Sequence, residues 1–179
     1  MTLQIESPRL TIVPLDPRLM RLRLDDYGAL QKALCVEPLS EPHYGDAAYD
    51  KRVHESLEAV TEHLERSATG YLWYTFWQII SKEHNSIIGE FNFHGPPNDN
   101  GEIQVGYVVR RAHRMCGYAT EGVGTMATWV SQQRGVTALV ADTGTDNTAS
   151  RRVLEKSGAQ LFQVKRDVLR WRIEAAVSD

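Results

Sequence analysis

Cysteine is scarce in this chain, and long apolar runs are absent. Cys35 and Cys116 are the only cysteines among 179 residues, which argues against a disulfide framework and for a reducing compartment. No apolar segment approaches the roughly 20 residues that a membrane-spanning helix needs. The N-terminus shows no charged lead followed by an apolar core, so no signal peptide is evident. We therefore expect a cytoplasmic protein with no membrane partner.

Excess charge and metal-ligand spacing are also missing. The formal net charge of −3 at pH 7 gives no overall attraction to nucleic acid. The six histidines show no close pair at ligand spacing, and two separated cysteines make no metal knuckle, so no metal site is expected. No repeat or long linker divides the chain, and a hydrophobic content of 42% is enough for a sizeable core. Residues 1–179 are expected to form a single domain.

The spacing of apolar residues predicts an α/β fold, in which a central mixed sheet of about six to seven strands has helices on both faces. Helical spacing occurs in Arg18–Val36, Tyr49–Ser67, Ala119–Arg134 and Asn147–Ser157. Strand-like segments are Leu3–Leu15, Tyr71–Ile80, Ile87–His94, Glu102–Val109, Val136–Asp142, Gln160–Val164 and Val168–Ile173.

The segment Ile103–Trp129 carries the strongest functional signal. An apolar strand leads into a turn that contains three arginines and His113, and the turn then opens a helix. A helix N-terminus offers free N–H groups and the positive end of the helix dipole, so a pyrophosphate can bind there. Gly117 lets the backbone approach the anion closely. The pattern predicts a nucleotide-cofactor site; the alternative is an ordinary strand-to-helix turn with surface arginines.

Three segments, in order, resemble the GNAT acyltransferases, which use acetyl-CoA. Arg114-Met115-Cys116-Gly117-Tyr118-Ala119 fits the pattern R/Q-x-x-G-x-G/A of their pyrophosphate loop, although many relatives carry glycine in place of Met115. Asn147–Ala159 resembles their second cofactor segment. Ser7–Leu15 resembles the opening strand of the Rim-type branch, which acetylates the N-termini of ribosomal proteins. The resemblance implies a GNAT-like fold and acetyl-CoA as co-substrate.

The resemblance also implies roles for individual residues. Backbone groups of Val108 and Val109 would pair with the pantetheine arm and donate an N–H to the thioester carbonyl. Asn147 would reach the pantetheine amides, although asparagine is also a favoured helix N-cap. Ser150 would lie near the sulfur, where its hydroxyl could protonate the leaving thiolate. The loop of residues 114–119 would bind the pyrophosphate.

Several carboxylates compete for the role of general base. Asp142 is the first candidate, because it ends a predicted strand and several relatives carry a carboxylate there; a plain turn residue is the alternative. Glu102 and Glu90 are rivals on the two preceding strands. Glu90, Asn92 and His94 alternate with aromatic residues, so they share a sheet face that either lines the amine site or meets water. A water relay could replace any one carboxylate.

The sequence therefore predicts an N-acetyltransferase whose primary-amine acceptor, such as a protein N-terminus, attacks the thioester directly. Two alternatives stay open: an acetyltransferase for a small amine, such as an aminoglycoside or polyamine, and a non-catalytic acyl-CoA-binding module. Homodimer formation is also left open. Glu37, Glu41, Asp46 and Asp50 favour a cationic amine acceptor, or simply a solvated loop. Cys116 lies at the pyrophosphate end and is not expected to be a nucleophile.

Overall fold

The computed structural model describes residues 3–42, 44–45 and 47–175, which contain an eight-stranded mixed sheet in the order β1-β2-β3-β4-β5-β6-β8-β7. The helices are α1 (Pro17–Asp25), α2 (Tyr27–Ala33), α3 (Ala47–Arg66), α4 (Tyr118–Ser131) and α5 (Thr148–Lys156). The strands are β1 (Ile5–Glu6), β2 (Leu10–Pro14), β3 (Phe76–Ser81), β4 (Ser86–Phe93), β5 (Glu102–Val109), β6 (Ala138–Gly144), β7 (Gln160–Lys165) and β8 (Val168–Glu174). The mixed α/β architecture is confirmed, with eight strands instead of six or seven.

The first predicted strand is in fact a hairpin. β1 pairs antiparallel with β2, and the N–H of Ser7 donates to the carbonyl of Leu10 at 2.9 Å across the turn. The prediction has one strand fewer because the pattern of Leu3–Leu15 indicates one continuous strand. In the structure Pro8 and Arg9 lie in a turn that divides this segment into β1 and β2.

Two further element boundaries differ from the prediction. The predicted helix Arg18–Val36 is broken at Asp26, where φ is −151° and ψ is 90°. The Asp26 carboxylate accepts the N–H of Ala29 at 2.8 Å and so begins a new helix. At Tyr71–Trp73 the chain forms a 3₁₀ turn, and the β3 strand begins only at Phe76.

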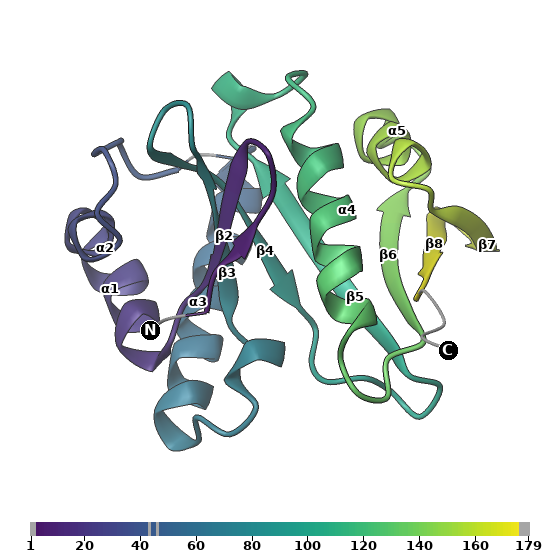
Figure 1. Cartoon of the computed structure of the whole chain (residues 1–179), viewed down its shortest axis with the longest axis horizontal. Helices are drawn as coiled ribbons and strands as arrows, with labels where there is room; N and C mark the ends of the chain where they lie inside the picture. The colour runs from purple at the N-terminus through teal and green to yellow at the C-terminus, as the bar shows by residue number, and fades with distance from the viewer. Residues whose placement is uncertain (1–2, 43, 46, 176–179) are drawn as a thin grey trace.

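Helices cover both faces of the sheet, as Figure 1 shows for α4 on one side and α1–α3 on the other. The apolar cluster under α4 includes Phe91 and Met126, and the cluster under α1–α3 includes Leu15 and Leu64. Trp77 belongs to the first cluster, where its ring centroid lies 4.8 Å from that of Trp129 on α4, whereas the neighbouring Phe76 belongs to the second. The sheet is thus a rigid platform between two layers.

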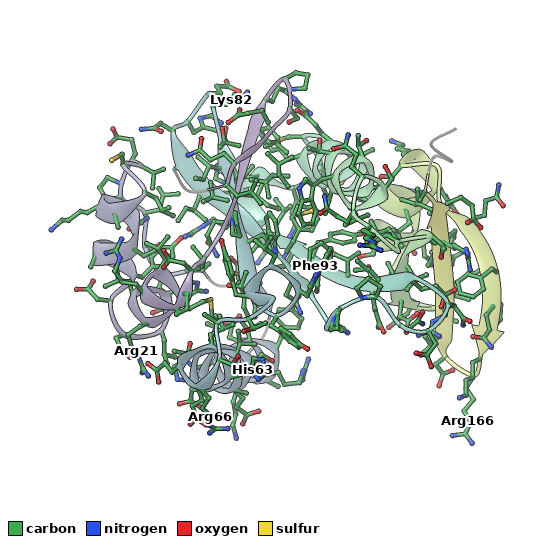
Figure 2. The ribbon with its side chains drawn as sticks, turned by 60° about the horizontal axis from the view of Figure 1, so that its bottom comes forward. Arg21, His63, Arg66, Lys82, Phe93 and Arg166 are labelled. Carbon is green, nitrogen blue, oxygen red and sulfur yellow. The ribbon has the colours of Figure 1, made fainter. Side chains whose placement is uncertain are left out.

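The α1–α3 layer covers only part of its face. Its apolar cluster takes sheet residues from β2, β3 and β4, and within the described ranges it takes none from β5, β6 or β8. Figure 2 shows Arg166 at the tip of the β7–β8 hairpin, far from Arg21 on α1 and Arg66 on α3. The half of this sheet face that α1–α3 leave uncovered carries polar side chains, and the candidate site lies at its border.

Across the described chain, no helix is both long and apolar enough to cross a membrane.

Candidate functional site

β5 and β6 run parallel but pair only where they begin. Their register pairs end at Gln104↔Val140, although β5 continues to Val109 and β6 to Gly144. β5 stays paired with β4 as far as Val109, so β5 and β6 separate beyond Gln104. Separated strands leave backbone N–H and C=O groups without a sheet partner, and an extended ligand can pair with them.

The alternation of backbone groups along β5 decides which residues face this separation. The carbonyl of Gln104 and the N–H of Arg110 both bond to β4, at 3.0 Å and 2.8 Å. Because the direction of these groups alternates from residue to residue, Val108 also points its backbone at β4. Tyr107 and Val109 point theirs toward the β6 side. The backbone groups of Tyr107 and Val109 therefore face the gap between β5 and β6, where Arg114 already binds the carbonyl of Val109, whereas the backbone of Val108 does not face it.

The turn before α4 has the backbone shape of an anion site. Met115 and Gly117 have φ of 65° and 81°, in the left-handed region. Gly117 is the N-cap of α4 and supplies no side-chain cap, so the helix begins at Tyr118 and Ala119 without one. A bound anion there would meet uncapped N–H groups and the positive end of the helix dipole. The pyrophosphate loop predicted from the sequence therefore has suitable geometry.

Arg114 does not extend freely from this turn. Its Nε donates to the carbonyl of Val109 at 3.0 Å, and its Nη2 donates to the carbonyl of Tyr44. Nearby, Arg110 Nη2 donates to the carbonyl of Ser40 at 2.8 Å. Two arginines of the turn thus hold Ser40 and Tyr44, which precede α3, against the end of β5.

Arg9 supports the same turn from the N-terminal hairpin. Its Nη1 donates to the carbonyl of Cys116 at 3.0 Å, and its Nε lies 2.6 Å from Glu121 Oε2. Burial would raise the pKa of Glu121, but hydrogen bonds from Ser7 and Arg9 outweigh it and hold that pKa below its usual range. Sequence patterns do not predict the contact between Arg9 and Glu121, because the two residues lie 112 positions apart.

A pocket of about 460 Å³ joins the separation of β5 and β6 to the α3 side of the sheet. Its lining includes Val108, Asp142, Asn147 and Ser150, which the sequence had singled out. Glu102 is not part of the lining. The other side is formed by residues of α3, β3 and β4, namely Tyr49, Arg52, Val53, Phe76, Glu90, Asn92 and His94.

Asp142 and Glu102 are each bound by an arginine of β8. Asp142 Oδ1 lies 2.9 Å from Arg170 Nε, and Gln104 donates to its other oxygen at 3.4 Å. Glu102 Oε1 lies 2.6 Å from Arg172 Nη1. Asp142 also lies within β6, opposite Arg170, and not at the strand end that the sequence indicated. Protein donors therefore occupy both carboxylates.

Glu90 lies almost completely buried at the pocket, with 3% of its side chain exposed. Its Oε2 lies 3.5 Å from Arg23 Nε and accepts from Gln78 at 3.3 Å. Its Oε1 has no hydrogen-bond partner among the described residues. A buried carboxylate oxygen without a partner is costly, so a donor from a ligand or water is expected there.

His94 and Asn92 line the pocket on the same face of β4 as Glu90. Burial lowers the pKa of His94 below its usual 6.5, and the charge of Asp142 opposes this only in part. His94 is therefore an uncharged imidazole near neutral pH. A Cβ at Gly106 would lie 2.7 Å from Asn92 Oδ1, so a glycine at this β5 position makes room for the amide.

Asn147 and Ser150 lie together at the start of α5. The side chain of Asn147 accepts the N–H of Ser150 at 3.1 Å, which is the N-cap role that competed with ligand binding. The hydroxyl of Tyr107 donates to the carbonyl of Ser150 at 3.3 Å. Burial raises the pKa of Tyr107 to about 12, so this hydroxyl stays protonated and holds α5 against β5.

The acidic residues before and at the start of α3 offer fewer unpaired carboxylates to a cationic ligand than the sequence suggests. Glu41 Oε1 lies 3.8 Å from Arg23 Nη1, and Asp50 accepts the N–H of Tyr44 at 3.1 Å. Asp46 lies outside the described residues. Glu41 and Asp50 thus have partners within the protein, while Glu37 is exposed.

Known proteins resemble this chain in sequence and in fold. YjdG of Bacillus subtilis (strain 168), an uncharacterized N-acetyltransferase, is 30% identical over 95 residues, which is 53% of this chain and 56% of YjdG. The chain thus spans about half the length of the curated relatives it matches. RimL, a ribosomal L7/L12 alpha-N-protein acetyltransferase solved with coenzyme A, superposes with a TM-score of 0.66 at 17% identity, covering 96% of this chain and 98% of RimL.

A second solved structure has the same fold. The ribosomal-protein-S5-alanine acetyltransferase of Vibrio fischeri gives a TM-score of 0.64 at 13% identity, with 97% of each chain covered. At these identities the structures support the fold alone. The sequence match is independent of them, since residues 18–160 match the acetyltransferase (GNAT) domain family across most of the described elements. The chain therefore belongs to the GNAT acetyltransferase family.

Proposed function

We propose that this protein transfers the acetyl group of acetyl-CoA to a primary amine that attacks directly within a ternary complex. The observation that carries the proposal is the single pocket that joins the separated ends of β5 and β6 to the α3 side of the sheet. An acyl donor lying along β5 and an amine entering from the α3 side would meet there, and bringing them together removes much of the entropic barrier. Neither cysteine belongs to the lining, which favours direct attack over an acyl-cysteine.

The residues present fit acetyl-CoA as the donor. The uncapped start of α4, at Tyr118 and Ala119, would hold the pyrophosphate, and the backbone of Val109 would pair with the arm. Acetyl-CoA supplies an acetyl thioester, whose thiolate is a tolerable leaving group with a thiol pKa near ~8.5. The N–H of Tyr107 faces the same gap and would stabilise negative charge that develops on the carbonyl oxygen.

His94 is the proton acceptor in this proposal. A protein α-amine has a pKa of about 7.7–8.0 and must lose a proton before or during attack. Asp142 and Glu90 are held by arginines, whereas His94 lines the same pocket as an uncharged imidazole. Asp142, the first candidate from the sequence, would keep a negative charge near the imidazole and so support its protonated form.

Ser150→Ala is expected to lower kcat by less than about tenfold, because thiolate can leave without being protonated. Its backbone contacts with Asn147 and Tyr107 do not use the hydroxyl, so α5 should stay in place. Steady-state kinetics and coenzyme A affinity by calorimetry would be measured side by side. A loss of several hundredfold in kcat with unchanged affinity would make the Ser150 hydroxyl an essential acid.

Cys116→Ala is expected to retain nearly all turnover. The turn is supported through the carbonyl of Cys116, which Arg9 binds, and alanine keeps that carbonyl. The test combines turnover with mass spectrometry of the protein after exposure to acetyl-CoA. An acetyl adduct on Cys116, together with loss of turnover in the alanine variant, would contradict direct attack.

The function itself is tested by screening amines and N-terminal peptides against acetyl-CoA, with release of free thiol as the readout. Peptides are included because the structurally similar RimL is named as a protein N-terminal acetyltransferase. Turnover of any primary amine, with the acetyl group found on nitrogen, supports the proposal. Tight binding of acetyl-CoA without turnover of any of the amines would instead favour an acyl-CoA-binding module.

A further inference from the structure

The pocket lining contains two carboxylates, Glu90 and Asp142, and each is paired with an arginine. Glu90 Oε2 lies 3.5 Å from Arg23 Nε, and the side chain of Arg23 is 2% exposed. Asp142 is held by two nitrogen atoms of Arg170, at 2.9 Å and 3.3 Å. Each arginine offsets part of the charge of its carboxylate, which weakens the attraction of the pocket for a polycation.

Arg52 is different from the other charged side chains of the lining. It projects from α3, is exposed, and its guanidinium carbon lies 5.5 Å from the centroid of the Tyr49 ring. In the part of the chain that the structure describes, no ion pair joins Arg52 to a carboxylate. His94 adds no charge near neutral pH, because burial lowers its pKa. Among the described residues that line the pocket, Arg52 is therefore the cationic side chain presented to an entering molecule without an ion pair.

We propose that the amine acceptor carries a carboxylate a few bonds from its amino group, and that Arg52 selects this anionic group. The inference rests on the proposed function. The amino group would donate to Glu90 Oε1, the buried oxygen that has no partner, and the carboxylate would meet Arg52 at the exposed side. Both residues line one pocket of about 460 Å³, so an acceptor that reaches both carries its two groups within the span of that pocket.

This arrangement disfavours polyamines and aminoglycosides. A second ammonium group near Arg52 would meet a like charge, and such repulsion is a common means of excluding a wrong ligand. The same chemistry is offered by a free amino acid and by a protein N-terminus with an acidic residue close behind it. Matched acceptors of each kind separate these two sources.

The test compares kcat/KM for acceptors that differ in one charge. One series is a set of C-terminally amidated peptides identical except for aspartate, asparagine or lysine at the second position. The other is 4-aminobutanoate against putrescine, which have similar chains but opposite end groups. The unmodified protein is expected to prefer the anionic member of at least one series over its cationic counterpart by about tenfold, the size of one charge-assisted contact.

Arg52→Glu is expected to reverse that preference. Lys51→Glu is the matched control, because it makes the same change in net charge one residue away, at a side chain that is outside the lining. The control should keep the preference of the unmodified protein. A preference for lysine or putrescine, or a ratio unchanged by Arg52→Glu, would overturn the inference while leaving acetyl transfer intact. No turnover of any acceptor would reject the proposed function, and the inference with it.

Discussion

Replacing His94 by glutamine is expected to lower kcat by about 10²–10⁴-fold, the usual contribution of a general base. Glutamine remains polar and of similar length, but its amide cannot take a proton from the attacking amine. Coenzyme A affinity should not change, because His94 lines the amine side of the pocket, away from the turn at α4. Steady-state kinetics with calorimetry of coenzyme A binding would separate the two effects.

The pH profile distinguishes His94 from the carboxylates. An imidazole must be neutral to accept a proton, so kcat/KM should fall as the pH drops through the pKa of His94, which burial places below 6.5. Loss of the negative charge in Asp142→Asn should move this acidic limb to still lower pH, since that charge raises the pKa of His94. Full activity in His94→Gln, combined with a loss of over a hundredfold in Asp142→Asn, would assign the base to Asp142.

The sequence predicts most of the fold because its strongest signals are local. Apolar spacing places α3, α4 and α5 within a few residues of their observed bounds, and Gly158, with φ of 83°, follows the end of α5. The misses lie where a short local feature interrupts a longer pattern. Asp26 splits one amphipathic segment into two helices, and the turn before Leu10 splits one apolar segment into two strands.

The candidate site is less predictable, because its side chains are paired by contacts between distant segments. Asp142 and Arg170 are 28 positions apart and meet only through the register of β6 and β8. The sequence indicates Asp142 as the first candidate for the general base, but it does not indicate that the guanidinium of Arg170 binds this carboxylate. His94 was visible as one of three polar residues on a single strand face, and only the shape of the pocket distinguishes it from a surface histidine.

The pyrophosphate turn lies between these two cases. A local motif was sufficient to place the turn and the start of α4, whereas the positive φ of Met115 is seen only in the structure. The role of the Arg114 side chain was not local. The motif suggested a direct contact with phosphate, whereas the structure shows both of its bound nitrogens donating to carbonyls, one of them on Tyr44, 70 positions away.

Arg114→Glu is expected to raise the dissociation constant for coenzyme A by about ten- to a thousandfold. The change removes the two charge-assisted hydrogen bonds that join the turn to Val109 and Tyr44, each worth about 1.5–3 kcal/mol. It also places a negative charge beside the turn where the pyrophosphate would bind. Calorimetry of coenzyme A binding gives the constant, and thermal unfolding shows whether the variant is folded.

Arg111→Glu is the matched control for this prediction. It makes the same change in net charge in the same turn, and its exposed side chain has no hydrogen bond among those resolved in the described residues. If general electrostatic attraction holds the cofactor, the two variants should lose affinity equally. If Arg114 acts by holding the turn against Val109 and Tyr44, its variant should lose about tenfold more affinity. An unchanged dissociation constant in folded Arg114→Glu would remove the pyrophosphate site from this turn.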